Sequence, residues 1–292
     1  MSKVILITGT STGFGRDAAE TLAQAGYRVF ASMRDIVGRN QAPAESLRAR
    51  KIEVVELDVT NDASVQGGVA SVLKAAGRID VLINNAGVGA TGISEAYTTN
   101  QMRDLFEVNV FGVQRILRAV LPTLRKQGDG LVINIGSVLG RVTMPFGGLY
   151  GATKFALDAI TQSYRYELSP FGVEVVLVQP SAYPTDIWSK TIVPSDAGCI
   201  SSYGDLVKVL ENLGARIGQM LSGENAPDAH DVAEALLKLV GEQKGFRPAR
   251  VVVGNSFGAD LVNDTAAVVQ TQALNALGLS ALSPASDNTA KT

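Results

Sequence analysis

The chain has 292 residues, of which 46% are hydrophobic, and this is enough to bury the core of one large domain. Its 26 Lys and Arg nearly balance its 28 Asp and Glu, and because it also lacks a basic run we expect no nucleic-acid partner. A single cysteine and a single histidine exclude an internal disulfide and leave no ligand set for zinc, so we expect chemistry without a metal ion.

The amino-terminal residues predict neither a signal peptide nor a membrane span. Residues 1–9 contain a short apolar stretch that breaks at glycine and lacks a small-residue cleavage site. No apolar run approaches the roughly 20 residues that cross a bilayer, although association with a membrane surface through an amphipathic segment stays open. We therefore expect a cytoplasmic protein.

Strands and helices are expected to alternate along the chain. Short, β-branched and almost continuously apolar runs predict strands at residues 4–8, 28–32, 52–57, 79–84, 131–135, 173–179 and 250–253. Helical periodicity occupies segments between them, among these 16–25, 63–76, 102–125 and 153–168. Continuously apolar strands are typical of a parallel sheet covered on both faces. The sequence therefore predicts an α/β fold of the Rossmann type, a doubly wound parallel sheet of about seven strands with helices on both faces.

We expect one domain over residues 1–279, in which dinucleotide binding and catalysis are combined. Within it, residues 183–226 have no predicted strand and one predicted helix, at 203–221. Insertions at this edge of a parallel sheet commonly cover a ligand, so we interpret the segment as a substrate lid. The last segment, residues 280–292, is polar and is expected to be disordered.

The first predicted strand runs directly into a glycine-rich turn, which a helix follows at once. Glycine permits the positive φ and the close backbone approach that such a turn needs, and free amides at the helix start can bind a pyrophosphate. A tight turn alone would also explain the glycines, but the position between strand and helix favours a dinucleotide site. We expect cofactor contacts from Gly9, Ser11, Thr12, Gly13, Phe14 and Gly15.

The end of the second strand indicates which nicotinamide cofactor is bound. An acidic side chain there would bind the ribose hydroxyls of NAD and repel a 2′-phosphate. The chain has Met33 at this place, followed by Arg34, whose guanidinium can hold a phosphate, so we expect NADP(H) to be favoured over NAD(H). Two alternatives remain open. Arg34 is a solvated residue paired with Asp35, or the strand is shifted by two residues and Asp35 is the acidic selector.

A serine, a tyrosine and a lysine form the predicted chemical centre. Ser137 follows the fifth strand, and Tyr150 and Lys154 are one helical turn apart, so their side chains share a face. The ammonium of Lys154 should lower the pKa of Tyr150 from about 10, which lets the tyrosine act as general acid in reduction and as base in oxidation. Ser137 would hydrogen-bond the substrate oxygen. Taken singly, a packing tyrosine and a solvated lysine would explain the pair equally well.

These motifs together resemble the short-chain dehydrogenase/reductase family, over roughly residues 3–190. The turn has the spacing TGxxxGxG, Asn84-Asn85-Ala86-Gly87 matches the family's NNAG motif, and the serine, tyrosine and lysine occur in the family's order. The resemblance implies cofactor contacts from Asp58, Val59, Asn85, Ala86, Gly87, Tyr150, Lys154, Pro180 and Thr185.

The same resemblance gives Asn109 a role and exposes one departure. It implies that Asn109 kinks the fourth helix and holds a water in a proton relay to Lys154. Ser181 stands where the family has glycine after Pro180, a departure that can alter the backbone near the cofactor.

The residues around the chemical centre resemble the subgroup that contains 17β-hydroxysteroid and retinol dehydrogenases. The likeness lies in residues 32–35, 137–146 and 153–157. It implies NADP preference and apolar alcohols or ketones as substrates. An apolar wall is expected beside Ser137, from Leu139, Met144, Phe146, Tyr183, Ile187 and Trp188. Such clusters are packing more often than recognition, so the substrate itself stays open.

The predicted function is that of an NADP(H)-dependent carbonyl reductase or alcohol dehydrogenase that interconverts a ketone or aldehyde with an alcohol. Family members are often dimers or tetramers, which implies a homo-oligomer built through residues 102–125 and 153–168. One alternative is a non-catalytic NADP(H)-sensing regulator, but such proteins commonly lose the tyrosine or the lysine. Another is a halohydrin dehalogenase, against which the intact glycine-rich turn speaks. His230 is expected at the surface or at a helix cap, and Cys199 in a structural role.

Overall fold

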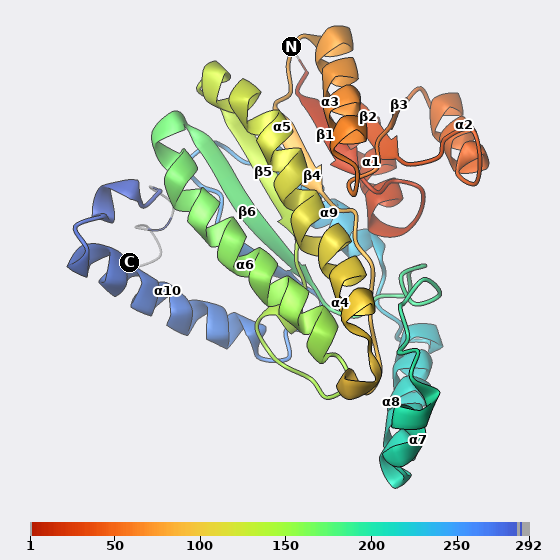
Figure 1. The fold of residues 1–292 in the computed structure, drawn as a ribbon. Coiled ribbons are helices and arrows are strands. Elements are labelled where there is room, and N and C mark those ends of the chain that lie inside the picture. Colours follow the sequence, from red (N-terminus) through yellow and green to blue (C-terminus); the bar gives the residue numbers. More distant parts are fainter. Residues whose placement is uncertain (1, 285–286, 288–292) are drawn as a thin grey trace.

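The strands of the computed structural model, which describes residues 2–284 and 287, are β1 (Val4–Thr8), β2 (Arg28–Met33), β3 (Glu53–Glu56), β4 (Val81–Asn84), β5 (Gly130–Ile135), β6 (Val173–Pro180) and β7 (Arg250–Val253). They form one 7-stranded sheet in the order β3-β2-β1-β4-β5-β6-β7, and every neighbouring pair is parallel. Helices cover both faces of the sheet (Figure 1). The predicted Rossmann-type α/β fold is confirmed.

Alternate residues of the central strands point into two separate hydrophobic layers. In β1, Ile5 and Ile7 pack into one layer and Val4 and Leu6 into the other. The first layer is covered by α1 (Gly13–Gln24), α2 (Gln41–Ala49) and α9 (His230–Gly241), and the second by α3 (Asp62–Ala76), α5 (Gly112–Gln127) and α6 (Gly148–Leu168). Because both faces of each strand are covered, its sequence is continuously apolar.

The helix predicted at residues 102–125 is divided in two. The first part is α4 (Thr99–Phe106), and one wider π-helical turn, Glu107–Phe111, separates it from α5. Single π turns inside helices are frequent at functional sites, because they displace the backbone locally. The break therefore lies where the resemblance to the family placed Asn109.

Three helices of the described chain were not predicted, α2, α7 (Ala197–Ser202) and α10 (Ala259–Ala276). Among their residues, α2 buries Ala44 and Leu47, and α10 buries Ala259 and Leu274. Helical periodicity in a sequence reflects a buried apolar stripe. Helices that bury so few side chains have a weak stripe and escape prediction.

The segment after β6 contains α7 (Ala197–Ser202) and α8 (Asp205–Ser222), and α8 agrees with the helix predicted at 203–221. Both helices project beyond the carboxyl-terminal edge of the sheet (Figure 1). No residue of α8 is fully buried. None of the described helices, α8 included, is long and apolar enough to cross a membrane.

The carboxyl-terminal segment departs in part from the predicted disorder. Residues Ser280–Leu282 form a 3₁₀ turn, and the carboxylate of Asp287 lies 2.6 Å from the guanidinium of Arg165, which is buried in α6. Local turn geometry and this ion pair can order a polar segment that has no hydrophobic signal. Residues 285–286 and 288–292 of the predicted tail lie outside the described residues.

Candidate active site

A cavity of about 790 Å³ lies along the carboxyl ends of the strands. In open α/β sheets this edge is where ligands bind. The residues predicted to contact a cofactor line it with one exception: Gly9, Ser11, Thr12, Gly13, Phe14, Arg34, Asp58, Val59, Asn85, Ala86, Gly87, Tyr150, Lys154, Pro180 and Thr185. The exception is Gly15.

The glycine-rich turn has the backbone that its sequence predicts. Gly9 and Gly13 have φ values of 72° and 60°, in the region that favours glycine. A Cβ on Gly9 would lie 2.7 Å from the Cα of Ala86, so only glycine allows the two segments to pack this closely. Gly15 acts in the same way, because a Cβ there would collide with the amide of Asn85. Gly15 does not line the cavity, and its small size serves the packing of α1.

Asn85 braces the glycine-rich turn from the next strand of the sheet. Its Nδ2 donates to the carbonyl oxygens of Thr8 and Gly9, at 2.9 and 3.0 Å. In return, Thr8 Oγ1 accepts from the backbone N–H groups of Asn85 and Ala86, both at 3.0 Å. Two segments 77 residues apart in sequence are thus fixed against each other at the cavity floor.

The end of β2 presents basic side chains to the cavity. β2 ends at Met33, with Ser32 paired to Thr8 of β1. Arg34 and Arg39 line the cavity, whereas Asp35 does not, and its carboxylate accepts a hydrogen bond from the backbone N–H of Arg39 at 3.0 Å. The guanidinium of Arg34 lies 3.8 Å from the carboxylate of Asp58, so Asp35 is not its partner.

The carboxylate of Asp58 already accepts hydrogen bonds from a neighbouring residue. Its Oδ1 accepts from the N–H and the hydroxyl of Thr60, at 2.9 and 2.8 Å. Partial burial by itself would raise the pKa of Asp58, but the hydrogen bonds from Thr60 and the nearby charges of Arg34 and Arg39 lower it below its usual value. The carboxylate is therefore charged at neutral pH.

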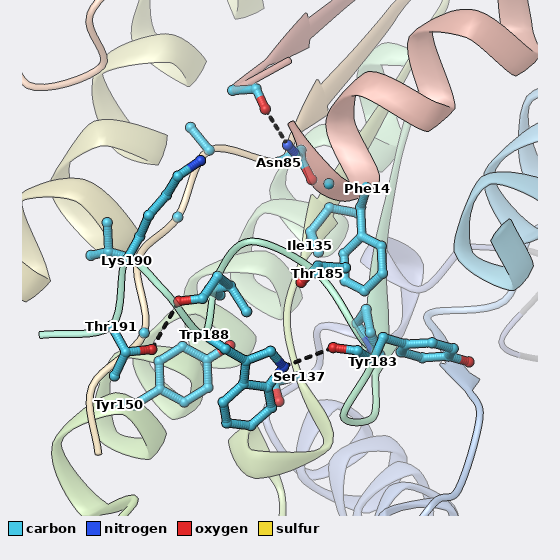
Figure 2. A pocket seen from close by; sticks show the side chains of 18 of the residues that line it. Phe14, Asn85, Ile135, Ser137, Tyr150, Tyr183, Thr185, Trp188, Lys190 and Thr191 are labelled. Carbon is cyan, nitrogen blue, oxygen red and sulfur yellow. Dashed lines mark hydrogen bonds between the residues drawn. The ribbon is translucent and has the colours of Figure 1, made fainter. Parts of the chain in front are cut away.

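Ser137 and Tyr150 meet on the side of the cavity that is opposite the glycine-rich turn. Ser137 directly follows β5, is nearly buried, and its Oγ accepts from the N–H of Leu139 at 3.1 Å. Tyr150 lies in the first turn of α6, and Figure 2 shows its ring beside Trp188. Burial raises the pKa of Tyr150 to about 12, and its contact with Ser137 offsets only part of this effect.

The pKa of Tyr150 lies above its ordinary value, whereas a lowering by Lys154 was predicted. The Nζ of Lys154 lies 5.6 Å from the centre of the Tyr150 ring and donates to the carbonyl oxygen of Ile135 at 2.8 Å. Burial also lowers the pKa of Lys154 itself to about 8. Burial is the first cause of both shifts, because it disfavours the charged form of each group.

Asn109 lies behind the cavity wall and does not line it. Its Oδ1 accepts from the N–H of Val88, and its Nδ2 donates to the carbonyl oxygen of Val88, both at 2.9 Å. The same Nδ2 donates to Thr153 Oγ1 at 3.1 Å, next to Lys154. The buried carboxamide thus joins the π turn to a lining residue and to α6, while its role in a water relay stays a prediction.

Five of the six residues predicted to form an apolar wall line the cavity, and Phe146 does not. These five are Leu139, Met144, Tyr183, Ile187 and Trp188. Phe146 has a φ of 65° in the turn before α6, a backbone conformation that hydrophobic periodicity cannot reveal. Tyr183 touches the cavity, but its side chain is 2% exposed and packs edge-to-face on Phe14, with ring centres 5.6 Å apart. Figure 2 shows its ring turned away from Tyr150.

Among the lining residues that sequence reasoning missed, two groups lie in the segment after β6. Leu213, Ile217 and Met220 come from α8, together with Arg216. Their spacing of four and three residues places the three apolar side chains on one helix face, and this signal could have found them. Lys190 and Thr191 come from the loop before α7, where no periodic pattern marks a residue.

Neither the histidine nor the cysteine lines the cavity. His230 begins α9 at the surface, and its Nδ1 lies 3.0 Å from the carboxylate of Asp17 in α1. The hydrogen bond and charge of Asp17 raise the pKa of His230. Cys199 lies in α7, and its backbone N–H donates to Asp196.

The sequence is similar to known dehydrogenases. The family model described as short chain dehydrogenase matches residues 3–193. The 3-ketodihydrosphingosine reductase of Bacteroides thetaiotaomicron is 33% identical over 260 residues, which is 84% of this chain and 93% of that protein. Human 17-beta-hydroxysteroid dehydrogenase type 1 is 36% identical over 196 residues, which is 65% of this chain and 59% of that protein. With bovine retinol dehydrogenase 8, 30% identical over 248 residues, these relatives confirm the predicted resemblance.

Solved structures show the same likeness. A short-chain dehydrogenase from Streptomyces avermitilis is 30% identical with a TM-score of 0.75, and the match covers 95% of this chain and 97% of that one. A family member from Burkholderia phymatum, in complex with NAD, is 28% identical with a TM-score of 0.72, over 90% and 91%. A variant of actinorhodin polyketide ketoreductase with NADPH is 27% identical with a TM-score of 0.72, over 88% and 97%.

Proposed function

This chain belongs to the short-chain dehydrogenase family, and on that premise we propose that it is an NADP(H)-dependent carbonyl reductase or alcohol dehydrogenase that acts on apolar molecules. The observation that carries the proposal is the convergence of Ser137, Tyr150 and Lys154 on a cavity that also receives the glycine-rich turn. When bound, the nicotinamide cofactor supplies or accepts the hydride. The proposal includes a cytoplasmic location and a homo-oligomer.

The residues present fit a dinucleotide. The first turn of α1 offers backbone N–H groups that have no partner within the helix, and these are suited to a pyrophosphate. A Cβ on Gly87 would lie 3.4 Å from Asn109 Oδ1 and 3.9 Å from Lys154 Nζ, so glycine keeps the space in front of the lysine open. These two features support a site for the pyrophosphate at α1 and for the nicotinamide nucleotide beside Lys154.

Tyr150 is proposed as the proton donor in reduction. Because its pKa is about 12, the hydroxyl carries its proton at neutral pH and can give it to the carbonyl oxygen. The hydroxyl of Ser137 donates to the same oxygen and orients the substrate. The ammonium of Lys154 stabilises the phenolate that remains. Alcohol oxidation needs the phenolate at the start, so this direction is favoured by alkaline pH.

The preference for NADP(H) is supported by the charges beyond β2. Arg34 and Arg39 line the cavity there, and Asp35 is turned to the backbone of its own loop. Two guanidinium groups can hold a 2′-phosphate, and the carboxylate of Asp35, 3.9 Å from the guanidinium of Arg39, does not line the cavity. Solved relatives hold NADPH in one case and NAD in another, so the basic residues of this chain carry the argument.

An apolar substrate is supported by the wall of the cavity. Leu139, Met144, Ile187 and Trp188 adjoin Ser137 and Tyr150, and α8 adds further aliphatic side chains. Apolar pockets with few polar groups select apolar ligands and use the polar groups for orientation. Two relatives are named for a long-chain ketone and for a steroid, which agrees with this chemistry.

The test is the loss of reduced-nicotinamide absorbance with NADPH, and separately with NADH, over aryl ketones, aliphatic aldehydes, a 17-ketosteroid and retinal. Tyr150→Phe is expected to lower kcat/KM by about 10²- to 10⁴-fold, because it removes the proton donor. Tyr164→Phe removes a hydroxyl from the same helix, one that donates to Gln114 outside the cavity, and should retain activity. Tight NADPH binding without turnover of any compound would instead favour a regulator that senses the cofactor.

A further inference from the structure

Ser137 begins a short 3₁₀ turn that packs directly on α6. It is the N-cap of the turn, Val138–Gly140, and its carbonyl oxygen accepts from the N–H of Gly140 at 2.9 Å. A Cβ on Gly140 would lie 2.8 Å from the carbonyl oxygen of Lys154, so the turn and the helix are in contact. The position of the Ser137 hydroxyl therefore depends on how this turn is held against α6.

Arg141, the residue that follows the turn, is joined to α6 by an ion pair. Its Nη1 donates to Asp158 Oδ2 at 3.1 Å, and the two side chains are only 11% and 9% exposed. Asp158 lies one helical turn after Lys154, and Lys154 lies one turn after Tyr150, so the three share a face of α6. The pair thus connects the far end of the Ser137 turn to the helix that carries the proposed proton donor.

A second arginine holds the same carboxylate from the opposite side. Arg250 of β7 contacts Asp158 with two N–H groups, Nε to Oδ1 at 2.7 Å and Nη2 to Oδ2 at 3.0 Å. Arg141 Nη2 also donates to the carbonyl oxygen of Val262 in α10, at 3.3 Å. In the described part of the chain, Asp158 is the one carboxylate that pairs with either arginine. The cluster therefore contains two buried cations and one buried anion.

This charge cluster is a poor source of stability. Burial lowers the pKa of Arg141, and the charge of Asp158 offsets only part of this effect. Arg141 Nε is buried and has no hydrogen-bond partner among the described residues. Apolar residues can often replace a buried ion pair without loss of stability, because the desolvation of the charges offsets their attraction. The geometry that the cluster imposes on the Ser137 turn explains it better than its contribution to folding.

We propose that Arg141 is a positioning residue for the proposed reaction: paired with Asp158, it holds Ser137 where its hydroxyl can bind the substrate oxygen that Tyr150 protonates. The inference rests on the proposed function, because it takes Ser137 and Tyr150 as partners on one oxygen. It goes beyond that function in giving a role to Arg141 and Asp158, which do not line the cavity and act only through Ser137.

The turn is fixed at its other end by the sheet. The N–H of Gly136, just before Ser137, donates to the carbonyl oxygen of Val178 in β6 at 2.7 Å. Without Arg141, this strand end would hold the turn, and the ion pair to α6 would be lost. A displacement of about 1 Å at a group that orients the substrate can lower the rate about 100-fold. The loss of Arg141 should therefore slow the chemical step and leave cofactor binding unchanged.

Arg141→Met is a cleaner test than a change of Asp158. It leaves the carboxylate paired with Arg250, whereas loss of Asp158 would leave two buried arginines without a counter-charge. Arg250→Met is the matched control, because it removes the other arginine of the same carboxylate from β7, outside the Ser137 turn. Arg141→Lys tests for rescue, since Arg141 contacts Asp158 through one nitrogen and an ammonium can replace that contact.

The experiment measures the single-turnover rate of NADPH oxidation with the panel compound that the wild type reduces fastest, together with the Kd for NADPH and thermal unfolding. Arg141→Met should lower the rate about 10- to 100-fold at an unchanged Kd. Arg141→Lys should recover most of the rate, and Arg250→Met should retain it.

A double-mutant cycle separates positioning from a general effect on the fold. Ser137→Ala removes the hydroxyl through which Arg141 is proposed to act. Adding Arg141→Met to Ser137→Ala should therefore leave the rate of the single variant unchanged within about twofold. A residue with an independent effect would lower the rate in both backgrounds.

Three results would overturn the inference while the wild type remains an active reductase. These are a wild-type rate in Arg141→Met, equal losses in Arg141→Met and Arg250→Met, and a loss in Arg141→Met that persists in the Ser137→Ala background. If the wild type binds NADPH but reduces no compound of the panel, the proposed function fails and the inference fails with it.

Discussion

The buried ammonium of Lys154 lowers the stability of the folded protein. Lys154 is 6% exposed, and burial lowers its pKa from 10.5 to about 8. At neutral pH the folded protein therefore keeps an ammonium in a place that disfavours it, with the carbonyl of Ile135 as its described hydrogen-bond partner. Strained or desolvated groups of this kind are typical of sites whose chemistry needs the charge.

We predict that Lys154→Met is inactive and yet more stable, by about 1–3 kcal/mol at pH 7. Between the folded pKa of about 8 and the unfolded value of 10.5, the unfolded chain binds more protons, so the wild type gains stability as pH rises through this window. The advantage of the variant should shrink over the same range. Urea denaturation at pH 7 and at higher pH measures it, and a variant that is less stable at both would refute the argument.

At the residue scale, the spacing of the motifs predicted which catalytic side chains lie together. It did not predict their burial or the backbone conformation of the turn before α6. The distance of one helical turn between Tyr150 and Lys154 is sufficient to place them together on α6. The pKa of Tyr150 was not predictable, because it depends on how much water the folded cavity admits. Phe146 was misplaced for a similar reason, since its positive φ belongs to a turn that periodicity does not describe.

At the element scale, α8 has an amphipathic pattern but no packed partner. It buries no residue, and its lining side chains Leu213, Ile217 and Met220 are half-buried or exposed. The apolar face of α8 is therefore available for contact with a ligand in the cavity. The existence of α8 was predictable from periodicity, whereas its position over the site depends on loop geometry that the sequence does not display.

We predict that Ile217→Ala raises the KM for an apolar ketone about 5- to 20-fold, because it removes aliphatic surface from the substrate wall. The Kd for NADPH should stay the same. Val209→Ala removes a valine that is 53% exposed on the same helix and does not line the cavity, so it serves as the control. Equal effects of the two substitutions would mean that α8 does not contact the substrate.

At the scale of the whole molecule, the parallel sheet with helices on both faces was predictable from the sequence, whereas its strand order comes from the structure. Continuously apolar strands separated by helices admit few arrangements, because crossovers in parallel sheets are right-handed. The surfaces are harder to predict. Phe111 is 48% exposed in the π turn and Phe155 is 40% exposed on α6, and nothing in the local pattern separates them from core residues.

We predict that Phe155→Asp converts a homo-oligomer to the monomer, because it places a charge on the helix face proposed to meet a second copy. Size-exclusion chromatography with light scattering measures the mass. Phe246→Asp is the control, since Phe246 is 62% exposed and follows α9, outside residues 102–125 and 153–168. A monomeric wild-type protein would refute the proposed assembly.

The segment between β6 and α9 has a consequence for how this fold acquires new specificities. It supplies no strand to the sheet, and Tyr183 is its one buried residue, so the core depends little on residues 184–226. Substitutions and changes of length there leave the hydrophobic layers and the strand register intact. The parts that bind the dinucleotide and move the proton can therefore be inherited unchanged while the surface that selects the substrate drifts. A chain built in this way separates the evolution of its chemistry from the evolution of its preference.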